Sequence, residues 1–166
     1  NARETARVLA EEYTHTYIDT IVCLDETEVI GTFMSEILAD ETNMSMSHDN
    51  NISVVTPEFD TMGQILFRDN KIRMIENKQV LILAASITTG KTILKAAESV
   101  PYYGGKVCGV AGIFSAVSRI ADMEVKSIFT SADLPDYKAY TPQSCPMCRE
   151  GKRVEALVNS YGYSKL

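Results

Sequence analysis

The first half of the chain alternates between two spacings of apolar residues. Positions 6, 9, 10 and 13 share one helical face, and positions 30, 33, 34, 37 and 38 form a second helical stripe. Between these stripes, residues 18–24 predict a strand, and residues 52–55 predict another short strand. Residues 39–51 are mostly polar and their apolar positions lack a period, so they predict a connecting loop.

The second half of the chain continues the alternation of strands with helices. The apolar run Val80–Leu83 predicts a strand buried on both faces, and apolar positions 93, 96, 97 and 100 predict a helix that ends before Pro101. The other predicted elements are a hairpin within residues 61–77 with arms at 64–67 and 71–75, strands at 107–114 and 125–129, and a short helix at 116–121. This alternation indicates an α/β fold with a doubly wound, mostly parallel sheet.

Composition restricts the class of protein. With 166 residues, of which 45% are hydrophobic, the chain fits one ordinary domain over residues 1–166. A formal net charge of −6, without a run of lysine or arginine, argues against nucleic acid as a partner. No apolar stretch approaches the roughly 20 residues of a membrane span and no secretion signal is visible, so we expect a cytoplasmic protein without membrane contact. The chain begins at Asn1 rather than at methionine, which leaves open a preceding segment.

The junction between the predicted strand at 80–83 and the next helix carries the strongest chemical signal. Its residues combine hydroxyl groups, a glycine and a lysine: Ser86, Ile87, Thr88, Thr89, Gly90, Lys91 and Thr92. Hydroxyl groups donate hydrogen bonds, glycine lets the backbone approach a ligand closely, and the N-terminal N–H groups of a helix attract anions. The pattern predicts a phosphate-binding loop, and the simpler alternative is an ordinary Thr-capped turn between a strand and a helix.

A second alternative is the P-loop of the nucleoside triphosphatases. Residues 85–92 satisfy a relaxed form of the pattern GxxxxGK[ST], with Ala85 in the place of the first glycine. That loop usually follows the first strand of its domain, whereas earlier strands are predicted here. It also expects an apolar strand that ends in an aspartate for Mg²⁺, and residues 107–114 end without one.

The four cysteines fall into two groups. Cys23 and Cys108 lie in apolar, strand-like runs and are expected to be buried thiols. Cys145 and Cys148 form a CxxC motif in a proline-containing segment, which fits either a redox pair or free thiols. A structural zinc site normally needs four ligands, so a nearby histidine would have to contribute, either His15 or His48. We therefore expect no metal site.

The segment Val80–Thr92 resembles the signature of the type I phosphoribosyltransferases, in which an apolar strand is followed by two acidic residues and a Thr-rich turn with glycine. Within that family the chain is most similar to the orotate phosphoribosyltransferases. Residues 21–32 resemble the family's pyrophosphate loop, residues 64–78 resemble its flexible loop, and residues 142–151 resemble the tail of some bacterial orotate enzymes. The resemblance implies the type I fold, with the N-terminal hood that helps to cover the base reduced or absent here.

The resemblance also implies a ligand and a chemistry. Members of the family transfer a phosphoribosyl group from phosphoribosyl pyrophosphate to a base and release pyrophosphate, with Mg²⁺ as the cofactor. Residues 86–92 would then hold the 5′-phosphate of phosphoribosyl pyrophosphate or of a nucleotide monophosphate. Asp25, Glu26 and Thr27 would lie in the pyrophosphate loop. Members often pair with this loop near the partner subunit, so a homodimer is expected.

The sequence departs from the family pattern beside the ribose. Two acids that contact the ribose hydroxyls in the family are replaced here by Ala84 and Ala85, whose side chains cannot accept a hydrogen bond or orient a hydrated Mg²⁺. In the pyrophosphate loop, Glu28 and Val29 stand where small residues are usual. A side chain there occupies space needed by a diphosphate, and Glu28 adds like charge.

A further departure follows the predicted strand at 52–55, where the family often carries an Arg-Lys pair that contacts pyrophosphate. Thr56 and Pro57 occupy those positions. Cations of the predicted hairpin could substitute for the missing pair: Arg68, Lys71 and Arg73. Two functions therefore stay open. One is an orotate phosphoribosyltransferase-like enzyme with unassigned catalytic residues, and the other is a non-catalytic nucleotide-binding sensor or regulatory protein.

Overall fold

The computed structural model describes residues 1–43, 51–141, 143–159 and 162–166, which form two compact units, Asn1–Leu134 and Pro135–Leu166. The expectation of one domain over residues 1–166 stays a prediction. The first unit contains α1 (Ala2–Glu11), β1 (Thr20–Cys23), α2 (Glu28–Asn43), β2 (Ser53–Val55), β3 (Glu58–Phe59), β4 (Ile65–Leu66), α3 (Asp69–Ile72), β5 (Gln79–Ile87), α4 (Lys91–Tyr102), β6 (Lys106–Ser115), β7 (Arg119–Ile120) and β8 (Met123–Thr130).

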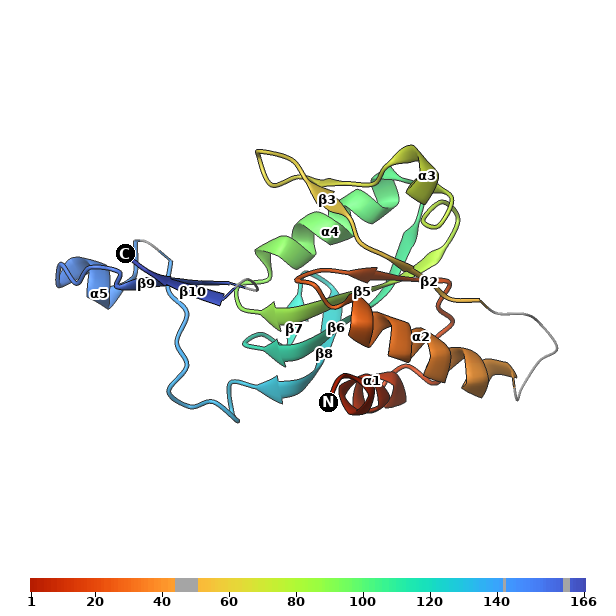
Figure 1. Cartoon of the computed structure of the whole chain (residues 1–166), viewed down its shortest axis with the longest axis horizontal. Helices are drawn as coiled ribbons and strands as arrows, with labels where there is room; N and C mark the ends of the chain where they lie inside the picture. Colours follow the sequence, from red (N-terminus) through yellow and green to blue (C-terminus); the bar gives the residue numbers. More distant parts are fainter. Residues whose placement is uncertain (44–50, 142, 160–161) are drawn as a thin grey trace. The chain divides into compact units, whose positions relative to one another are not determined.

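The central sheet of the first unit has the strand order β2-β1-β5-β6-β8-β7 (Figure 1). Neighbours from β2 to β8 pair in parallel, and only β7 pairs with its neighbour in the antiparallel direction among the described strands of this sheet. The prediction of a doubly wound, mostly parallel α/β sheet is therefore confirmed. Helical connections cross the sheet between β1 and β2 and between β5 and β6, as parallel pairing requires.

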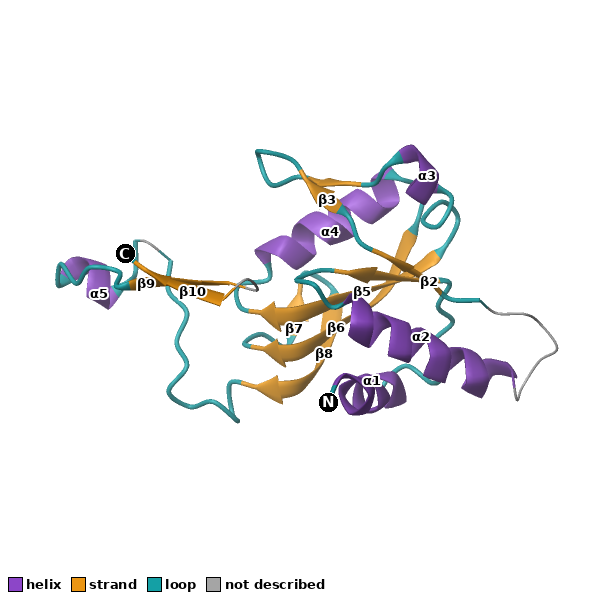
Figure 2. Ribbon diagram, viewed as in Figure 1, coloured by secondary structure: helices purple, strands orange, loops and turns teal. Residues whose placement is uncertain are grey.

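Helices cover both faces of this sheet (Figure 2). Along β5, Leu81 and Leu83 face the cluster that includes buried residues of α1 and α2, whereas Val80 and Ile82 face the cluster that includes buried residues of α4. These side chains are fully buried, and burial of each such aliphatic side chain contributes roughly 1.5–3 kcal/mol. The continuous apolar run in the sequence thus reflects a strand that packs on both sides.

Two predicted helix boundaries were wrong. The second helix extends through Asn43 into the segment predicted as a loop, and the rest of that segment, residues 44–50, lies outside the described residues together with His48. Helix α4 continues through Pro101 to Tyr102 rather than ending before the proline. A proline near the end of a helix removes one hydrogen bond only. At this helix end, the carbonyl groups of Val100 and Pro101 accept hydrogen bonds from the N–H groups of Gly105 and Gly104.

The structure contains a hairpin in which one predicted arm, residues 64–67, is confirmed, because β4 lies within it. Its strands are β3 and β4, which pair around a turn that Asp60 organises, since its carboxylate accepts hydrogen bonds of 2.8 Å from the N–H groups of Met62 and Gln64. The predicted second arm, residues 71–75, instead forms the end of α3 and the turns after it. Hydrogen bonds from an aspartate side chain to nearby backbone groups favour a turn, so the hairpin turn lies directly after Asp60 rather than between the two predicted arms.

The short helix predicted at residues 116–121 was also wrong. β6 runs to Ser115, and the chain then turns into the antiparallel pair β7 and β8, where Arg119 faces Glu124 and Ile120 faces Met123. The Ser115 hydroxyl donates to the Val117 carbonyl group at 2.6 Å, so it stabilises a turn in place of a helix.

The second unit is small. It contains α5 (Pro146–Arg149), β9 (Ala156–Asn159) and β10 (Gly162–Lys165), and the two strands pair in the antiparallel direction. Apart from Cys145, Pro146 and Ala156, which are half-buried, its side chains with a described exposure are exposed to solvent.

Candidate functional site

The strand order places a crevice between β1 and β5. From β1 the chain crosses to β2 on one side, and β5 lies on the other side, so the order of the strands reverses at this point. Open parallel sheets bind ligands outside the carboxyl ends of their strands at such a switch point. The segments that leave these ends are the turn Asp25–Glu28 after β1 and the loop Thr88–Gly90 after β5.

The loop after β5 leads directly into a helix. β5 ends at Ile87 and α4 begins at Lys91, with Gly90 as the residue before the first helical turn. Gly90 has a φ of 74°, and a Cβ atom at this position would lie 2.8 Å from side-chain carbons of Ile120. Both features require glycine. Because glycine has no capping side chain, the first N–H groups of α4 remain available to a ligand.

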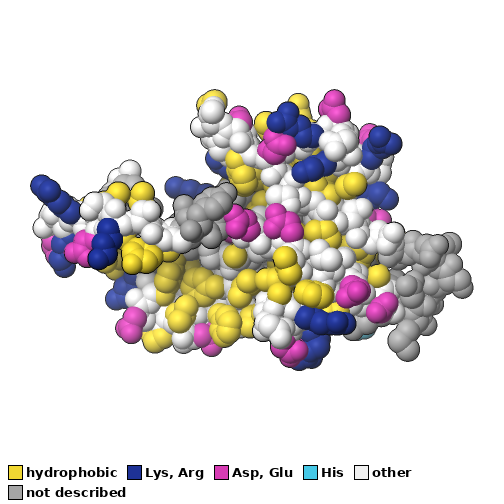
Figure 3. All heavy atoms as spheres, in the orientation of Figure 1, with side chains coloured by type: hydrophobic (Ala, Val, Ile, Leu, Met, Phe, Trp, Pro, Cys, Tyr) yellow, Lys and Arg dark blue, Asp and Glu magenta, His cyan; other side chains and the backbone are white. Residues whose placement is uncertain are grey.

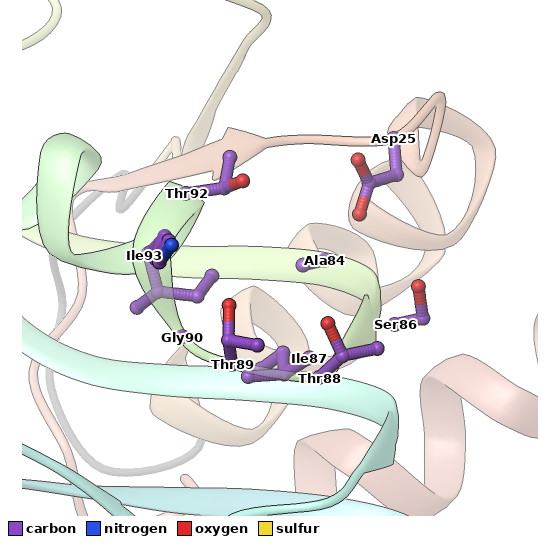
Figure 4. Close-up of a pocket in the computed structure, with 10 residues that line it drawn as sticks. Asp25, Ala84, Ser86, Ile87, Thr88, Thr89, Gly90, Thr92 and Ile93 are labelled. Carbon is purple, nitrogen blue, oxygen red and sulfur yellow. The ribbon is translucent and has the colours of Figure 1, made fainter. Parts of the chain in front are cut away.

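The predicted phosphate loop surrounds a small cavity of about 40 Å³. The lining residues are Asp25, Ala84, Ser86, Ile87, Thr88, Thr89, Gly90, Lys91, Thr92 and Ile93. In Figure 4 the hydroxyl groups of Ser86, Thr88 and Thr89 point to the same side, toward the space below Asp25. The structure thus brings all residues of the predicted 5′-phosphate loop around one space, together with one residue of the predicted pyrophosphate loop.

The turn after β1 has an unusual backbone. Asp25 and Glu26 have φ values of 54° and 59°, in the left-handed region that residues other than glycine rarely adopt. Thr27 holds the turn in place, because its buried hydroxyl group lies 2.8 Å from the Leu24 carbonyl oxygen and 3.3 Å from that of Leu83. Strained backbone of this kind is concentrated at functional sites in proteins.

One carboxylate of this turn lines the cavity, and a second follows it at the start of α2. The Asp25 side chain points toward the loop (Figure 4), and the Glu28 carboxylate accepts a hydrogen bond of 2.9 Å from the Thr56 hydroxyl group. Lys91 is the cation among the residues that line the cavity. A diphosphate beside Asp25 and Glu28 would meet like charge, whereas a single phosphate can lie against the hydroxyl groups, the helix start and Lys91.

The hairpin cations that could substitute for the missing pair do not line the cavity. Arg68 makes a bidentate ion pair with Glu58, with nitrogen to oxygen distances of 2.6 to 3.0 Å. Lys71 donates to the Thr56 carbonyl oxygen at 2.7 Å, and Arg73 is exposed. Figure 3 shows acidic and basic side chains intermingled over this part of the unit. The structure therefore does not gather these cations at the cavity.

The positions of the family's acids lie at the end of β5. Ala84 is buried beneath the cavity, and Ala85 is half-buried. Within the described ranges, no group of three or more His, Cys, Asp or Glu side chains could hold a metal ion. Ala84 and Ala85 therefore offer no carboxylate that could orient a hydrated Mg²⁺, and Asp25 is the carboxylate among the residues that line the cavity.

Two supporting contacts were missed by sequence reasoning. Ile120 packs over Gly90, but it lies in the segment that was predicted as a helix. The sequence offered one signal for this strand pair, the two apolar residues Ile120 and Met123 on either side of a tight turn. Lys95 on α4 donates to the Gly63 carbonyl oxygen at 2.7 Å and so attaches the hairpin of β3 and β4 to the helix that carries the loop. No local pattern indicates that contact.

Solved structures of phosphoribosyltransferases share this arrangement of strands and helices. The adenine phosphoribosyltransferase of Thermoanaerobacter pseudethanolicus superposes with a TM-score of 0.59 and 14% identity, covering 76% of this chain and 78% of that one. The chain has the type I phosphoribosyltransferase fold. The orotate phosphoribosyltransferase of Mycobacterium tuberculosis, solved in complex with 5-phospho-alpha-D-ribosyl 1-diphosphate, gives a TM-score of 0.55 at 18% identity and covers 80% of this chain and 75% of that one.

The sequence resembles orotate phosphoribosyltransferases over a shorter region. The enzyme of Caldicellulosiruptor bescii is 33% identical over 78 residues, which are 46% of this chain and 39% of the relative. The enzyme of Chlorobaculum parvum is 29% identical over 83 residues, which are 48% of this chain and 40% of the relative. The chain thus matches about two fifths of the length of these relatives. No protein-family model matches it.

Among the described residues, no helix is both long and apolar enough to span a membrane.

Proposed function

We propose that this protein binds the 5′-phosphate of a phosphoribosyl compound, either phosphoribosyl pyrophosphate or a nucleotide monophosphate, at residues 86–92. The observation that carries the proposal is the cavity formed by this loop at the switch point of the sheet. Two structural neighbours support the choice of ligand. One was solved with 5-phospho-alpha-D-ribosyl 1-diphosphate, and the other, adenine phosphoribosyl transferase from Trypanosoma brucei, with AMP, pyrophosphate and ribose-5-phosphate.

The chemistry of the loop suits a phosphate monoester. Such a group carries a charge of about −1.5 to −2 at pH 7 and offers several strong acceptor oxygens. The loop supplies hydroxyl donors, the N–H groups at the start of α4 and the ammonium group of Lys91. Charge-assisted hydrogen bonds to such donors are about twice as strong as neutral ones, so this small cavity can anchor a larger ligand.

Transferase activity is a second candidate function, and the same site argues against its efficiency. Departure of pyrophosphate from C1 of a ribose builds positive charge on the sugar ring, so the site must orient the ribose and neutralise the leaving group. Ala84 and Ala85 offer no side-chain acceptor to ribose hydroxyls, and Asp25 and Glu28 place negative charge where pyrophosphate would leave. Binding without turnover, as in a nucleotide sensor or regulatory protein, is therefore the better-supported function.

Calorimetry with the full chain tests the binding proposal. The ligands are AMP, UMP, orotidine monophosphate and phosphoribosyl pyrophosphate, with ribose 5-phosphate as the minimal probe. Thr88→Val and Thr92→Val each remove one hydroxyl group from the cavity and keep nearly the same shape. We expect each to weaken binding by roughly 10- to 100-fold, the range for a lost hydrogen bond to a charged group. Thr14→Val, an exposed threonine after α1, is the matched control. Equal affinity in all variants would remove the loop from the proposal.

A separate assay decides between binding and transfer. Release of pyrophosphate from phosphoribosyl pyrophosphate is measured with Mg²⁺ and orotate, uracil or a purine base. Turnover that depends on Mg²⁺ and on a base would establish the transferase. Its absence, beside tight binding in calorimetry, would support the non-catalytic function.

A homodimer and a cytoplasmic location belong to the same proposal. An apolar side chain at the start of α2, Val29, is 61% exposed beside the turn after β1, and family members often pair near that turn. Analytical ultracentrifugation of the wild type and of Val29→Lys tests this arrangement. We expect a dimer that the lysine weakens, and a monomeric wild type would contradict it.

A further inference from the structure

The second unit contains a pair of thiols that the phosphate site does not use. Cys145 precedes the short helix α5 and Cys148 lies within it. Cys145 is the residue that caps this helix and Cys148 is its third helical residue, so both thiols leave the same helical turn. Cys145 is half-buried, and Cys148 is exposed to solvent.

The pKa values of the two thiols shift in opposite directions, so one thiol is more acidic than the other. The N–H group of Cys148, followed by the thiol of Cys148, lowers the pKa of Cys145 below its ordinary value, and the Arg149 charge acts in the same direction. The hydrogen bond with Cys145 raises the pKa of Cys148. Since the thiolate is the nucleophile, Cys145 is the attacking group and Cys148 the group that resolves a mixed disulfide.

The other two thiols of the chain, Cys23 and Cys108, lie outside this helix and have raised pKa values. Burial raises the pKa of Cys23 to about 12 and that of Cys108 to about 11. Both lie in strands of the first unit, and all four cysteines, which belong to the described residues, are free thiols. They act as internal references for an unreactive thiol.

We propose that Cys145 and Cys148 form a redox-active dithiol that exchanges with small-molecule disulfides of the glutathione class. The Cys145 thiolate attacks one sulfur of the small disulfide, which forms a mixed disulfide and releases one thiolate. The Cys148 sulfur, after losing its proton, then attacks the Cys145 sulfur and displaces the second thiolate. The protein loses two hydrogen atoms and becomes an intramolecular disulfide, and the small disulfide is reduced to two thiols.

The described residues favour this chemistry over zinc binding. An exchange reaction needs the two thiols alone, and they lie within one helical turn. A structural zinc site needs four ligands, and no group of three or more His, Cys, Asp or Glu side chains assembles in the part of the chain that the structure describes. Two copies of the chain that share their pairs of cysteines would supply four thiol ligands, so zinc binding by this motif is an alternative that the experiment must distinguish.

Mass spectrometry of the full chain tests the proposal. The chain is equilibrated with reduced and oxidised glutathione, quenched with acid and alkylated. Trypsin cleavage after Lys138 and Arg149 releases both motif cysteines in one peptide, whereas Cys108 leaves in another. We expect the first peptide to lose the mass of two hydrogen atoms and Cys108 to remain reduced. In Cys148→Ser we expect a stable glutathione adduct on Cys145. In Cys145→Ser we expect little adduct on Cys148.

Rates of alkylation by iodoacetamide at neutral pH give a second readout. Cys145 should react at least about tenfold faster than Cys108, because its larger thiolate fraction outweighs its lower intrinsic nucleophilicity. Protection of Cys108 in each variant shows that the first unit is folded. Equal rates for the two cysteines would overturn the proposal. One zinc ion bound per two chains, with both motif thiols protected, would also overturn it.

Discussion

The Thr27 hydroxyl group lies 3.3 Å from the Leu83 carbonyl oxygen, and thereby ties the turn after β1 to β5 just before Ala84. The Leu24 N–H group donates to the same carbonyl oxygen at 2.8 Å. Thr27 is 2% exposed. The left-handed backbone at Asp25 and Glu26 is thus held by contacts between segments that lie far apart in the sequence.

Removal of the Thr27 hydroxyl group should weaken this connection. We expect Thr27→Val to destabilise the chain by about 0.5–1.5 kcal/mol, the net contribution of one hydrogen bond, because the hydroxyl donor is lost while the Leu24 and Leu83 carbonyl oxygens keep their backbone donors. Thr27→Ser keeps the hydroxyl group and should cost less than Thr27→Val. Urea unfolding of the three proteins measures the difference. Equal stability of the valine and serine variants would show that the hydroxyl group does not hold the turn.

A close contact between α2 and β1 predicts a coupled pair of substitutions. A Cβ atom on Gly31 would lie 2.5 Å from the Cys23 sulfur, which is buried in β1. We expect Gly31→Ala to destabilise the chain by roughly 1–3 kcal/mol, the usual cost of overpacking. Cys23→Ala opens space at this point, so the double variant should be more stable than the sum of the single effects predicts. Additive effects in a double-mutant cycle would place the cost of Gly31→Ala elsewhere.

Restoring the family's acids should affect stability differently at two adjacent positions. Ala84 is 1% exposed and packs in the cluster beneath α4, whereas Ala85 is half-buried. We expect Ala84→Asp to cost about 2–4 kcal/mol, because a buried carboxyl group without a partner loses its hydration, and Ala85→Asp to cost less. Thermal unfolding is measured for both variants and for Ala84→Ser. The serine variant separates the cost of burying a charge from the cost of burying a small polar group. An Ala84→Asp variant as stable as the wild type would show that the cavity hydrates this position.

Local sequence patterns predicted the parts of the fold that local interactions determine. β5 and α4 follow from an apolar run and a helical stripe on either side of Gly90, so the phosphate loop between them could be predicted as a contiguous segment. β7, and β3 as the partner of β4, could not be predicted in this way. Their turns depend on Asp60 and Ser115, whose hydrogen bonds to nearby backbone groups replace the expected arm and helix.

The other half of the site depends on contacts that no spacing reveals. The Thr56 hydroxyl group bonds to Glu28 across 28 positions of sequence, and Thr27 reaches Leu83 across 56. Sequence reasoning could therefore name residues of the pyrophosphate loop but not what holds that loop. It also treated Arg68 and Lys71 as candidates for the ligand, because their partners, Glu58 and the Thr56 carbonyl group, become visible only in the folded chain.

The raised pKa of Cys23 predicts a loss of stability in alkaline solution. Burial raises this pKa from an ordinary value of 9.0 to about 12, so the unfolded chain releases the thiol proton at a lower pH than the folded chain. The stabilising contribution is complete below pH 9 and is lost as pH rises toward 12. Between pH 8 and pH 10 we expect a loss of about 1 kcal/mol from this group, since each pH unit above the unfolded pKa costs at most about 1.4 kcal/mol. Buried Tyr13, whose pKa is also raised, contributes equally to wild type and variant. Urea unfolding of the wild type and Cys23→Ala at both pH values isolates the thiol, and parallel losses in the two proteins would contradict the assignment.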